Sequence, residues 1–328
     1  MLSRADTMIR NAVPADHAAL LALWQANAPR QGYASRPDAE VDRLLFRHPY
    51  FSYEYTFVRA EQGRAVAFIC GCVGNDIPHG RERGCFTCLV ADPAWDTPET
   101  TVQLLDALEE AFRVAGKTAS AVTFFNPMHL PWVIPGSPGH EHNNMPGIAT
   151  DLPLYERMLA HGYTEATQET AMYRTLADFA VPDTIRAQEQ QAAAEGNRIA
   201  LYDPARCHGL DAMLQALDNP DWTAQITEAG RTGALLPVAL VGNTVAGFAG
   251  PIYPEPTGRG YFAGIGIAPQ YQHRHLGKLL FFRLCEEEKK AGAAYMSLFT
   301  GITNPARRIY ESAGFRSVRT FGVLLKTL

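Results

Sequence analysis

The sequence predicts an α/β protein that contains two tandem copies of one fold, each a mixed sheet with parallel strands at its centre and helices on its faces. Three observations support this prediction. The chain of 328 residues is long enough for two domains of ordinary size. Its two halves repeat one order of apolar patterns. Within each half, a strand, a helix and a strand follow one another, which is typical of parallel pairing.

The elements of the repeat occur in the same order in both halves. Each half opens with two apolar runs around a Gly turn, which predict a β-hairpin. A strand that ends in Pro, an amphipathic helix that closes on a Gly, and a further strand follow. The matched segments, first half before second, are 57–71 and 238–250, 85–95 and 261–271, 100–116 and 275–292, and 120–126 and 294–301.

Each half closes with a helix and a strand, over residues 154–176 and 309–328. Between the halves, residues 181–196 are polar, rich in Gln and Ala, and end in Gly, which predicts a helical linker. We therefore expect an N-terminal domain over 8–180, a linker over 181–196 and a C-terminal domain over 197–328.

A long Pro- and Gly-rich loop over residues 126–148 occurs only in the first half. Its candidate metal ligands are His129, His140, Glu141 and His142. Imidazole and carboxylate groups bind zinc, but this spacing fits no closed coordination pattern, so we expect solvent-exposed histidines and no metal. The alternative is a lid over a substrate site that carries Trp132.

A basic turn precedes the second amphipathic helix, in the sequence IAPQYQHRHLGKLL at 267–280. The first amide groups of a helix have no partner within the helix, and the helix dipole favours an anion at that end. His273, Arg274 and Lys278 add positive charge around the same place. The pattern predicts a site for a phosphate group.

The pattern Gln272-x-x-His275-x-Gly277 resembles motif A of the GNAT acetyltransferase superfamily, although His275 stands where the family has Gly. The sequence NPARRIYESAGF at 304–315 resembles motif B. The resemblance implies that the first segment holds the diphosphate of acyl-CoA and that the preceding strand pairs with its pantetheine arm. The cofactor-binding residues that it implies are Ile265, Gly266, Ile267, Gln272, His273, Arg274, His275, Leu276, Gly277, Lys278, Asn304 and Arg307.

By the same resemblance, Tyr310 is the general acid that protonates the departing thiolate. A phenol has an ordinary pKa near 10, so it keeps its proton at neutral pH. The alternative is a half-buried helix aromatic. The strand before the turn contains no acid, so the base that deprotonates the amine stays open among Glu255, a water chain and a residue of the first half.

The first half carries Asp96 and Glu99 where a diphosphate would lie, and it lacks the glycines. These carboxylates would repel an anion. We expect Asp96 to cap the helix, with Pro98 in the first turn. The first half is therefore predicted to bind no acyl-CoA.

The composition excludes some classes of partner and compartment. A net charge of −5 gives no reason to expect nucleic acid or an anionic membrane as a partner. The N-terminus has no apolar leader, and six cysteines in apolar stretches indicate reduced thiols, so we expect a cytoplasmic protein. Cys85-x-x-Cys88 is interpreted as part of a packed strand rather than a metal or redox motif.

The function that these patterns favour is an acetyl-CoA-dependent N-acyltransferase that transfers its group directly to a small-molecule amine. Two alternatives remain: a non-catalytic acyl-CoA-binding protein, and a protein-lysine acetyltransferase. The sequence makes no prediction about oligomeric state.

Overall fold

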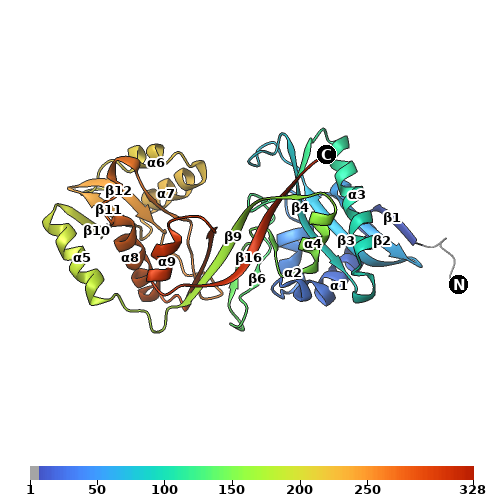
Figure 1. The fold of residues 1–328 in the computed structure, drawn as a ribbon, viewed down its shortest axis with the longest axis horizontal. Coiled ribbons are helices and arrows are strands. Elements are labelled where there is room, and N and C mark those ends of the chain that lie inside the picture. The colour runs from blue at the N-terminus through green and yellow to red at the C-terminus, as the bar shows by residue number, and fades with distance from the viewer. Residues whose placement is uncertain (1–6) are drawn as a thin grey trace. The chain divides into compact units, whose positions relative to one another are not determined.

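The computed structural model describes residues 7–328 and has a mixed α/β fold with parallel and antiparallel strands flanked by helices (Figure 1). The chain divides into two compact units. Unit 1 contains the residues up to Thr170 together with Arg319–Leu328, and unit 2 contains Ala171–Val318.

Unit 1 contains a sheet in the order β1-β2-β3-β4-β5-β16, with β8 paired to β16. Hairpin and neighbouring strands pair antiparallel, and β4 pairs with β5 in parallel after a helical crossover. Its elements are β1 (Thr7–Asn11), α1 (His17–Asn27), α2 (Asp38–Val41), β2 (Thr56–Glu61), β3 (Arg64–Cys72), β4 (Arg83–Ala91), α3 (Pro98–Val114), β5 (Ala119–Val122), β6 (Trp132–Val133), β7 (Glu141–His142), β8 (Ile148–Ala149) and α4 (Pro153–Ala160), with parts of β9 (Thr164–Thr175) and β16 (Arg316–Thr327).

Unit 2 contains a four-stranded antiparallel sheet in the order β10-β11-β12-β14, and it also contains the neighbouring strands β9, β15 and β13. Its elements are α5 (Asp183–Ala194), β10 (Asn197–Leu201), α6 (Leu210–Leu217), α7 (Pro220–Thr232), β11 (Pro237–Val241), β12 (Thr244–Ala249), β13 (Arg259–Gly260), β14 (Ile265–Ile267), α8 (Leu276–Lys290), β15 (Tyr295–Gly301) and α9 (Arg307–Ser312). The predicted helical linker corresponds to α5.

The last strand of the chain does not follow the expected division at 181–196. Residues Leu324 to Thr327 of β16 pair antiparallel with β5, so Arg319–Leu328 belong to unit 1. Conversely, the residues of β9 after Thr170 belong to unit 2. The two copies of the repeat therefore exchange parts of their closing strands, and each unit contains sequence from both halves.

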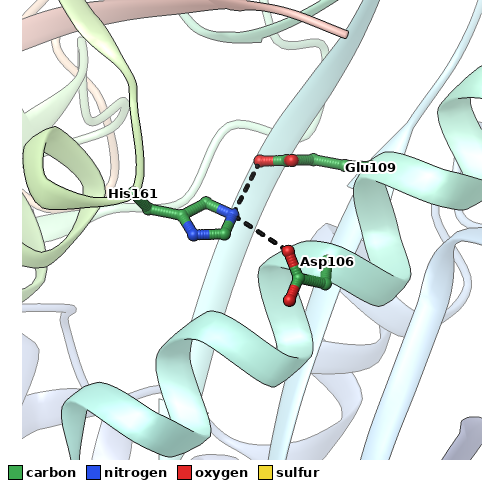
Figure 2. A group of neighbouring side chains, drawn as sticks. All are labelled: Asp106, Glu109 and His161. Atoms are coloured by element: carbon green, nitrogen blue, oxygen red, sulfur yellow. Dashed lines mark ion pairs between the residues drawn. The ribbon is translucent and has the colours of Figure 1, made fainter.

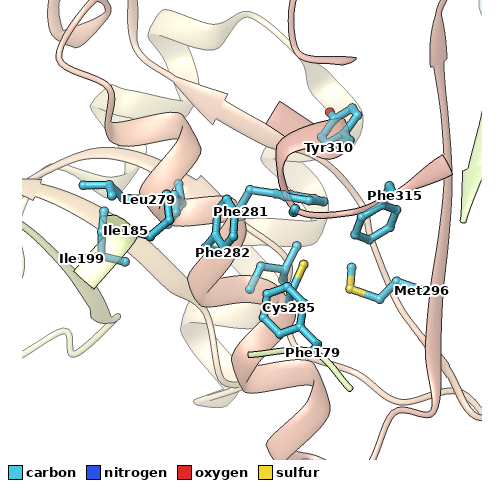
Figure 3. Packing of buried hydrophobic residues seen from close by; sticks show 14 of the residues in the cluster. Phe179, Ile185, Ile199, Leu279, Phe281, Phe282, Cys285, Met296, Tyr310 and Phe315 are labelled. Carbon is cyan, nitrogen blue, oxygen red and sulfur yellow. The ribbon is translucent and has the colours of Figure 1, made fainter. Parts of the chain in front are cut away.

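Alternating apolar residues on the strands place a helix on each face of both sheets. In unit 1, Phe68 on β3 lies in one core cluster with α1, and its neighbour Ile69 lies in another with α3. In unit 2, Ala239 on β11 packs in the cluster of α8, and Leu240 packs in the cluster of α6 and α7. Figure 3 shows the cluster around α8, in which Phe281, Phe282 and Cys285 meet side chains from several other elements. This packing fixes the start of α8, where the predicted anion site lies.

The six cysteines are free and buried. Cys85 and Cys88 lie on β4, opposite Cys72 and Cys70 of β3, as expected of a packed strand. Within residues 7–328, no helix combines the length and the hydrophobicity that a membrane crossing requires.

Candidate active site

Strand β14 presents one open edge of the four-stranded sheet. The Ala268 amide donates to the Ala246 carbonyl at 2.9 Å, and the Gly250 amide donates to the Gly264 carbonyl at 3.2 Å. In an antiparallel pair these bonds alternate along the strand, so the backbone groups of Ile265 and Ile267 face away from β12. The Ile267 carbonyl accepts a hydrogen bond from Nε2 of Gln272 at 3.3 Å, and the other outward groups of β14 can pair with an extended ligand.

Trp222 of α7 supports this strand, a role that no sequence pattern indicated. Its indole Nε1 donates to the Ala263 carbonyl at 3.0 Å. A Cβ on Gly264 would lie 2.5 Å from that indole, and a Cβ on Gly266 would lie 2.6 Å from Leu217. Both glycines are thus required by close packing of α6 and α7 against β14.

The turn between β14 and α8 has an unusual backbone. His273 and His275 have φ angles of 63° and 58°, in the left-handed region, whereas Arg274 between them does not. Alternation of this kind turns successive amide groups toward one concave side and makes an anion-binding nest. Within the described residues, the amides of His273 to Lys278 donate no hydrogen bond to the backbone. The helix dipole of α8 adds a partial positive charge at the same place.

A hollow of about 440 Å³ opens over this turn. Its lining residues are Ile267, Tyr271, Gln272, His273, Arg274, His275, Leu276, Gly277, Lys278, Arg308, Ile309 and Ser312. The lining includes no carboxylate. Arg274, Lys278 and Arg308 make no ion pair with any described residue, so their charges are available to a ligand. The predicted residues from Ile267 to Lys278 are therefore brought together in one basic hollow.

Two predicted cofactor-binding residues lie in local contacts instead. Asn304 accepts a hydrogen bond from the Ala306 amide at 3.0 Å, just before α9. Arg307 donates from Nε to Glu311 at 3.0 Å and is absent from the lining of the hollow. Its neighbour Arg308 lines the hollow. Which of the two adjacent arginines faces the hollow depends on the rotation of α9 about its own axis, and the sequence does not determine this rotation.

Tyr310 of α9 is only 4% exposed and packs against Phe281 with ring centroids 4.8 Å apart. Figure 3 shows its hydroxyl oxygen pointing away from the apolar cluster. No hydrogen bond joins this hydroxyl to another described residue. Burial raises the pKa of the Tyr310 phenol to about 12. Tyr310 does not line the hollow over the turn, so its hydroxyl and the nest occupy separate places in unit 2.

Two carboxylates of unit 2 are poorly suited to act as the base. Glu255 accepts two hydrogen bonds from the buried Arg259, at 2.7 and 3.1 Å, so both of its carboxylate oxygens are already engaged. Glu288 on α8 is fully buried, and burial raises its pKa to about 7. It accepts a hydrogen bond from the Tyr253 amide at 2.9 Å within the core.

The corresponding helix start in unit 1 lacks these features. Thr97, and not Asp96, caps α3 through a hydrogen bond from the Thr100 amide at 3.2 Å. Asp96 forms an ion pair with Arg157 instead. The expected cap at Asp96 is therefore wrong by one residue, because this carboxylate is drawn to the guanidinium on α4.

The loop over 126–148 fills the place where β4 and β5 diverge. Asn126 donates to the Phe86 carbonyl of β4 at 3.0 Å, and the space left there is about 20 Å³. Trp132 is fully buried, stacks on His142 and packs edge-on against Phe321. This packing makes Trp132 part of the core of unit 1 and argues against a lid that carries it over a substrate. The expectation of exposed histidines is also wrong for His142, which is buried beside Glu141 and its ion-pair partner Arg36.

Comparisons with known proteins agree with the geometry of unit 2. Residues 204–315 match the model of the acetyltransferase (GNAT) family. The matched segment contains β14, the basic turn, α8 and Tyr310. A search of curated proteins found no match.

Solved structures share the fold over almost the whole chain. A fungal multi-domain GH3 β-N-acetylglucosaminidase, described as having a GCN5-related glucosamine N-acetyltransferase region, has 17% identity and a TM-score of 0.70, over 99% of this chain and 38% of that chain. A GCN5-related N-acetyltransferase from Sphaerobacter thermophilus has 16% identity and a TM-score of 0.65, over 99% and 97%. A tandem GNAT protein from the clavulanic acid biosynthesis pathway has 15% identity and a TM-score of 0.59, over 98% of both chains.

Identity at this level relates folds and not activities. The chain spans 38% of the length of the fungal protein. It thus has the mixed-sheet fold of GCN5-related N-acetyltransferases along nearly its whole length, and its residues 204–315 match the GNAT acetyltransferase family.

Proposed function

We propose that this protein is an acetyl-CoA-dependent N-acyltransferase that acts on a small-molecule amine, with unit 2 as the catalytic unit. The observation that carries the proposal is the nest at the start of α8. There, unbonded amides, two left-handed residues and three unpaired cations surround one hollow. A diphosphate is the anion that such a cradle would hold, because several amides and cations can bind its oxygens together.

The open edge of β14 supports the same ligand. A pantetheine arm contains amide groups, which can pair with the outward backbone of Ile265 and Ile267 as a further strand would. Such pairing would carry the thioester along the strand, away from the hollow. The Ile265–Ile267 backbone would also offer an amide to the oxyanion of a tetrahedral intermediate.

The proposed reaction is direct transfer. The nitrogen of a neutral amine attacks the thioester carbon, the carbon–sulfur bond breaks, and the departing sulfur takes the proton of Tyr310. The proton lost by the amine passes to water, and Tyr310 recovers one from solvent. Its unpartnered hydroxyl and its raised pKa support this role, because the donor stays protonated at neutral pH.

Unit 1 is proposed to bind no acyl-CoA. The side-chain amide of Asn126 donates a hydrogen bond to the Phe86 carbonyl on β4, so this carbonyl is not available to a ligand. Asp96 and Glu99 place negative charge near the start of α3. Unit 1 would then act as a scaffold that completes the fold.

The substitution Gly277→Ala tests the cradle directly. An added Cβ would lie 3.6 Å from Ile309 and 3.7 Å from Ile267, both at ordinary contact distance and both in the lining of the hollow. The fold therefore tolerates Ala, and helix propensity favours it by up to about 1 kcal/mol. We expect an unchanged or higher melting temperature and a Kd for acetyl-CoA raised about 10-fold, by calorimetry on the full chain.

Lys278→Gln should weaken the binding of acetyl-CoA by about 10-fold or more, because it removes a charged contact to phosphate. Lys290→Gln at the other end of α8 is the matched control and should bind normally. Undiminished binding in both Gly277→Ala and Lys278→Gln would refute the site.

Release of free thiol from acetyl-CoA should then be assayed with an amine panel that includes glucosamine, the substrate in the name of the fungal protein. Tight binding without turnover on any amine would favour the non-catalytic alternative.

A further inference from the structure

A histidine and two carboxylates meet in unit 1, whereas the nest belongs to unit 2. Asp106 and Glu109 lie one turn apart on α3, and His161 follows the end of α4. Nε2 of His161 lies 3.4 Å from Oδ1 of Asp106 and 3.3 Å from Oε1 of Glu109 (Figure 2). Figure 2 shows both oxygens turned toward this one nitrogen. One potential ligand atom from each residue thus lies within 4.8 Å of the other two.

Two of these atoms are buried without a hydrogen bond. The side chain of Glu109 is 1% exposed and that of His161 is 9% exposed. Nε2 of His161 and Oε1 of Glu109 face each other at 3.3 Å, but neither atom forms a hydrogen bond with a described residue. A buried polar atom without a hydrogen bond costs about 1–3 kcal/mol. A bound ion that contacts both atoms would remove this cost.

The spacing of the atoms fits a metal ion between them. Zinc bonds to imidazole nitrogen and carboxylate oxygen are about 2.0–2.1 Å long, so two such ligands at a tetrahedral angle lie about 3.3–3.4 Å apart. Both separations from Nε2, 3.4 and 3.3 Å, fall in this range, and the two carboxylate oxygens lie within 4.8 Å of each other. The Asp106 side chain is 63% exposed, so a fourth position can open to solvent.

A lysine orients the buried carboxylate. Nζ of Lys326 donates to Oε2 of Glu109 at 2.7 Å and lies 5.7 Å from the centre of the Tyr163 ring. This contact occupies the second oxygen and leaves Oε1 for a ligand, as outer partners do in metal sites. Two carboxylates and one ammonium, with a neutral imidazole, give the cluster a net negative charge. The cluster can therefore accept a divalent cation.

We propose that Asp106, Glu109 and His161 bind a divalent cation of the zinc type. The bound ion would join α3 to the end of α4 and would stabilise unit 1. Its ligands come from segments separated along the chain, so the sequence did not indicate it and predicted no metal. The competing arrangement is a protonated His161 between two carboxylates, which would need no ion.

The test uses the full chain after dialysis against a chelator, titrated with zinc chloride by calorimetry and checked by elemental analysis. We expect one tight zinc ion per chain and a zinc-dependent rise in melting temperature. Asp106→Asn and His161→Gln should each weaken zinc binding by about 100-fold or more. Loss of a residue that only hydrogen-bonds a metal ligand typically weakens metal binding by about 10–100-fold. Glu110→Gln, an exposed neighbour on α3, is the matched control and should bind normally.

Cobalt loading should also give the strong visible absorption of a tetrahedral site, and Asp106→Asn should abolish it. Asp106 is exposed, so this variant decides the matter even where His161→Gln fails to fold. Zinc binding that is absent from the wild-type chain, or equal in the wild type and Asp106→Asn, would overturn the proposal in favour of the protonated histidine.

Discussion

Tyr310 has a buried aromatic ring, and its hydroxyl forms no hydrogen bond with another described residue. Tyr310→Phe keeps the packing on Phe281 and removes only the proton donor. We expect kcat to fall about 10²–10³-fold, with little change in the KM for acetyl-CoA or in the melting temperature. Tyr253→Phe, at an exposed tyrosine of the same unit, should have no effect. Full activity in Tyr310→Phe would contradict the assignment.

The raised pKa of Tyr310 also predicts the shape of the pH profile. The amine must lose a proton before it attacks, so kcat/KM should rise with pH toward the amine's pKa, near 10 for an alkylamine. An unshifted tyrosine would ionise over the same range and cause a fall. Because burial raises the pKa of Tyr310 to about 12, it keeps its proton there and no such fall should occur. A decline in kcat/KM near pH 10 would contradict a proton donor with the raised pKa of Tyr310.

At the scale of elements, the loop over 126–148 is part of the core of unit 1. Trp132, Leu130 and Ile134 are all buried. Trp132→Ala should therefore lower the free energy of unfolding by about 3–5 kcal/mol, as measured by denaturant titration. Pro138→Ala at the exposed tip of the loop is the control and should be neutral. A lid would give the opposite result, with normal stability and a changed KM for the amine.

The positions of helices and hairpins along the chain were predicted better than the surfaces that they contact in the folded protein. Local patterns were enough to place α3, α8 and the hairpins, because apolar period and turn residues act over a few positions. The sequence also showed His275 at a position where the motif it resembles has Gly, and its φ of 58° gives the physical reason for a Gly there. The pattern could not show that Arg308 rather than Arg307 lines the hollow, nor that Trp132 is buried. Both depend on which surface a helix or loop meets in three dimensions.

At the scale of the whole molecule, the closing strands tie each unit to the opposite half of the sequence. Leu324 of β16 is fully buried in the core of unit 1, although it lies four residues from the end of the chain. Leu324→Ala should lower the stability of unit 1 by about 2–5 kcal/mol. The isolated fragments 1–180 and 197–328 should each lack a cooperative thermal transition, whereas the full chain should show one. Cooperative unfolding of fragment 1–180 by itself would contradict the exchange.

The exchange could not be predicted from the repeat. The closing strands of the two halves have the same spacing from Gly to Leu, so their patterns do not distinguish one pairing partner from the other. Only long-range contacts, such as those between Leu324–Thr327 and β5, determine the choice.

The position of β16 has a consequence for synthesis on the ribosome. Domains generally fold in order as they emerge, at about 5–20 residues per second. Here the strand beside β5 is translated after the whole of unit 2, so unit 1 must wait on the order of ten seconds with that edge of its sheet unpaired. During this interval the nascent chain exposes a strand edge of the kind that chaperones protect from aggregation.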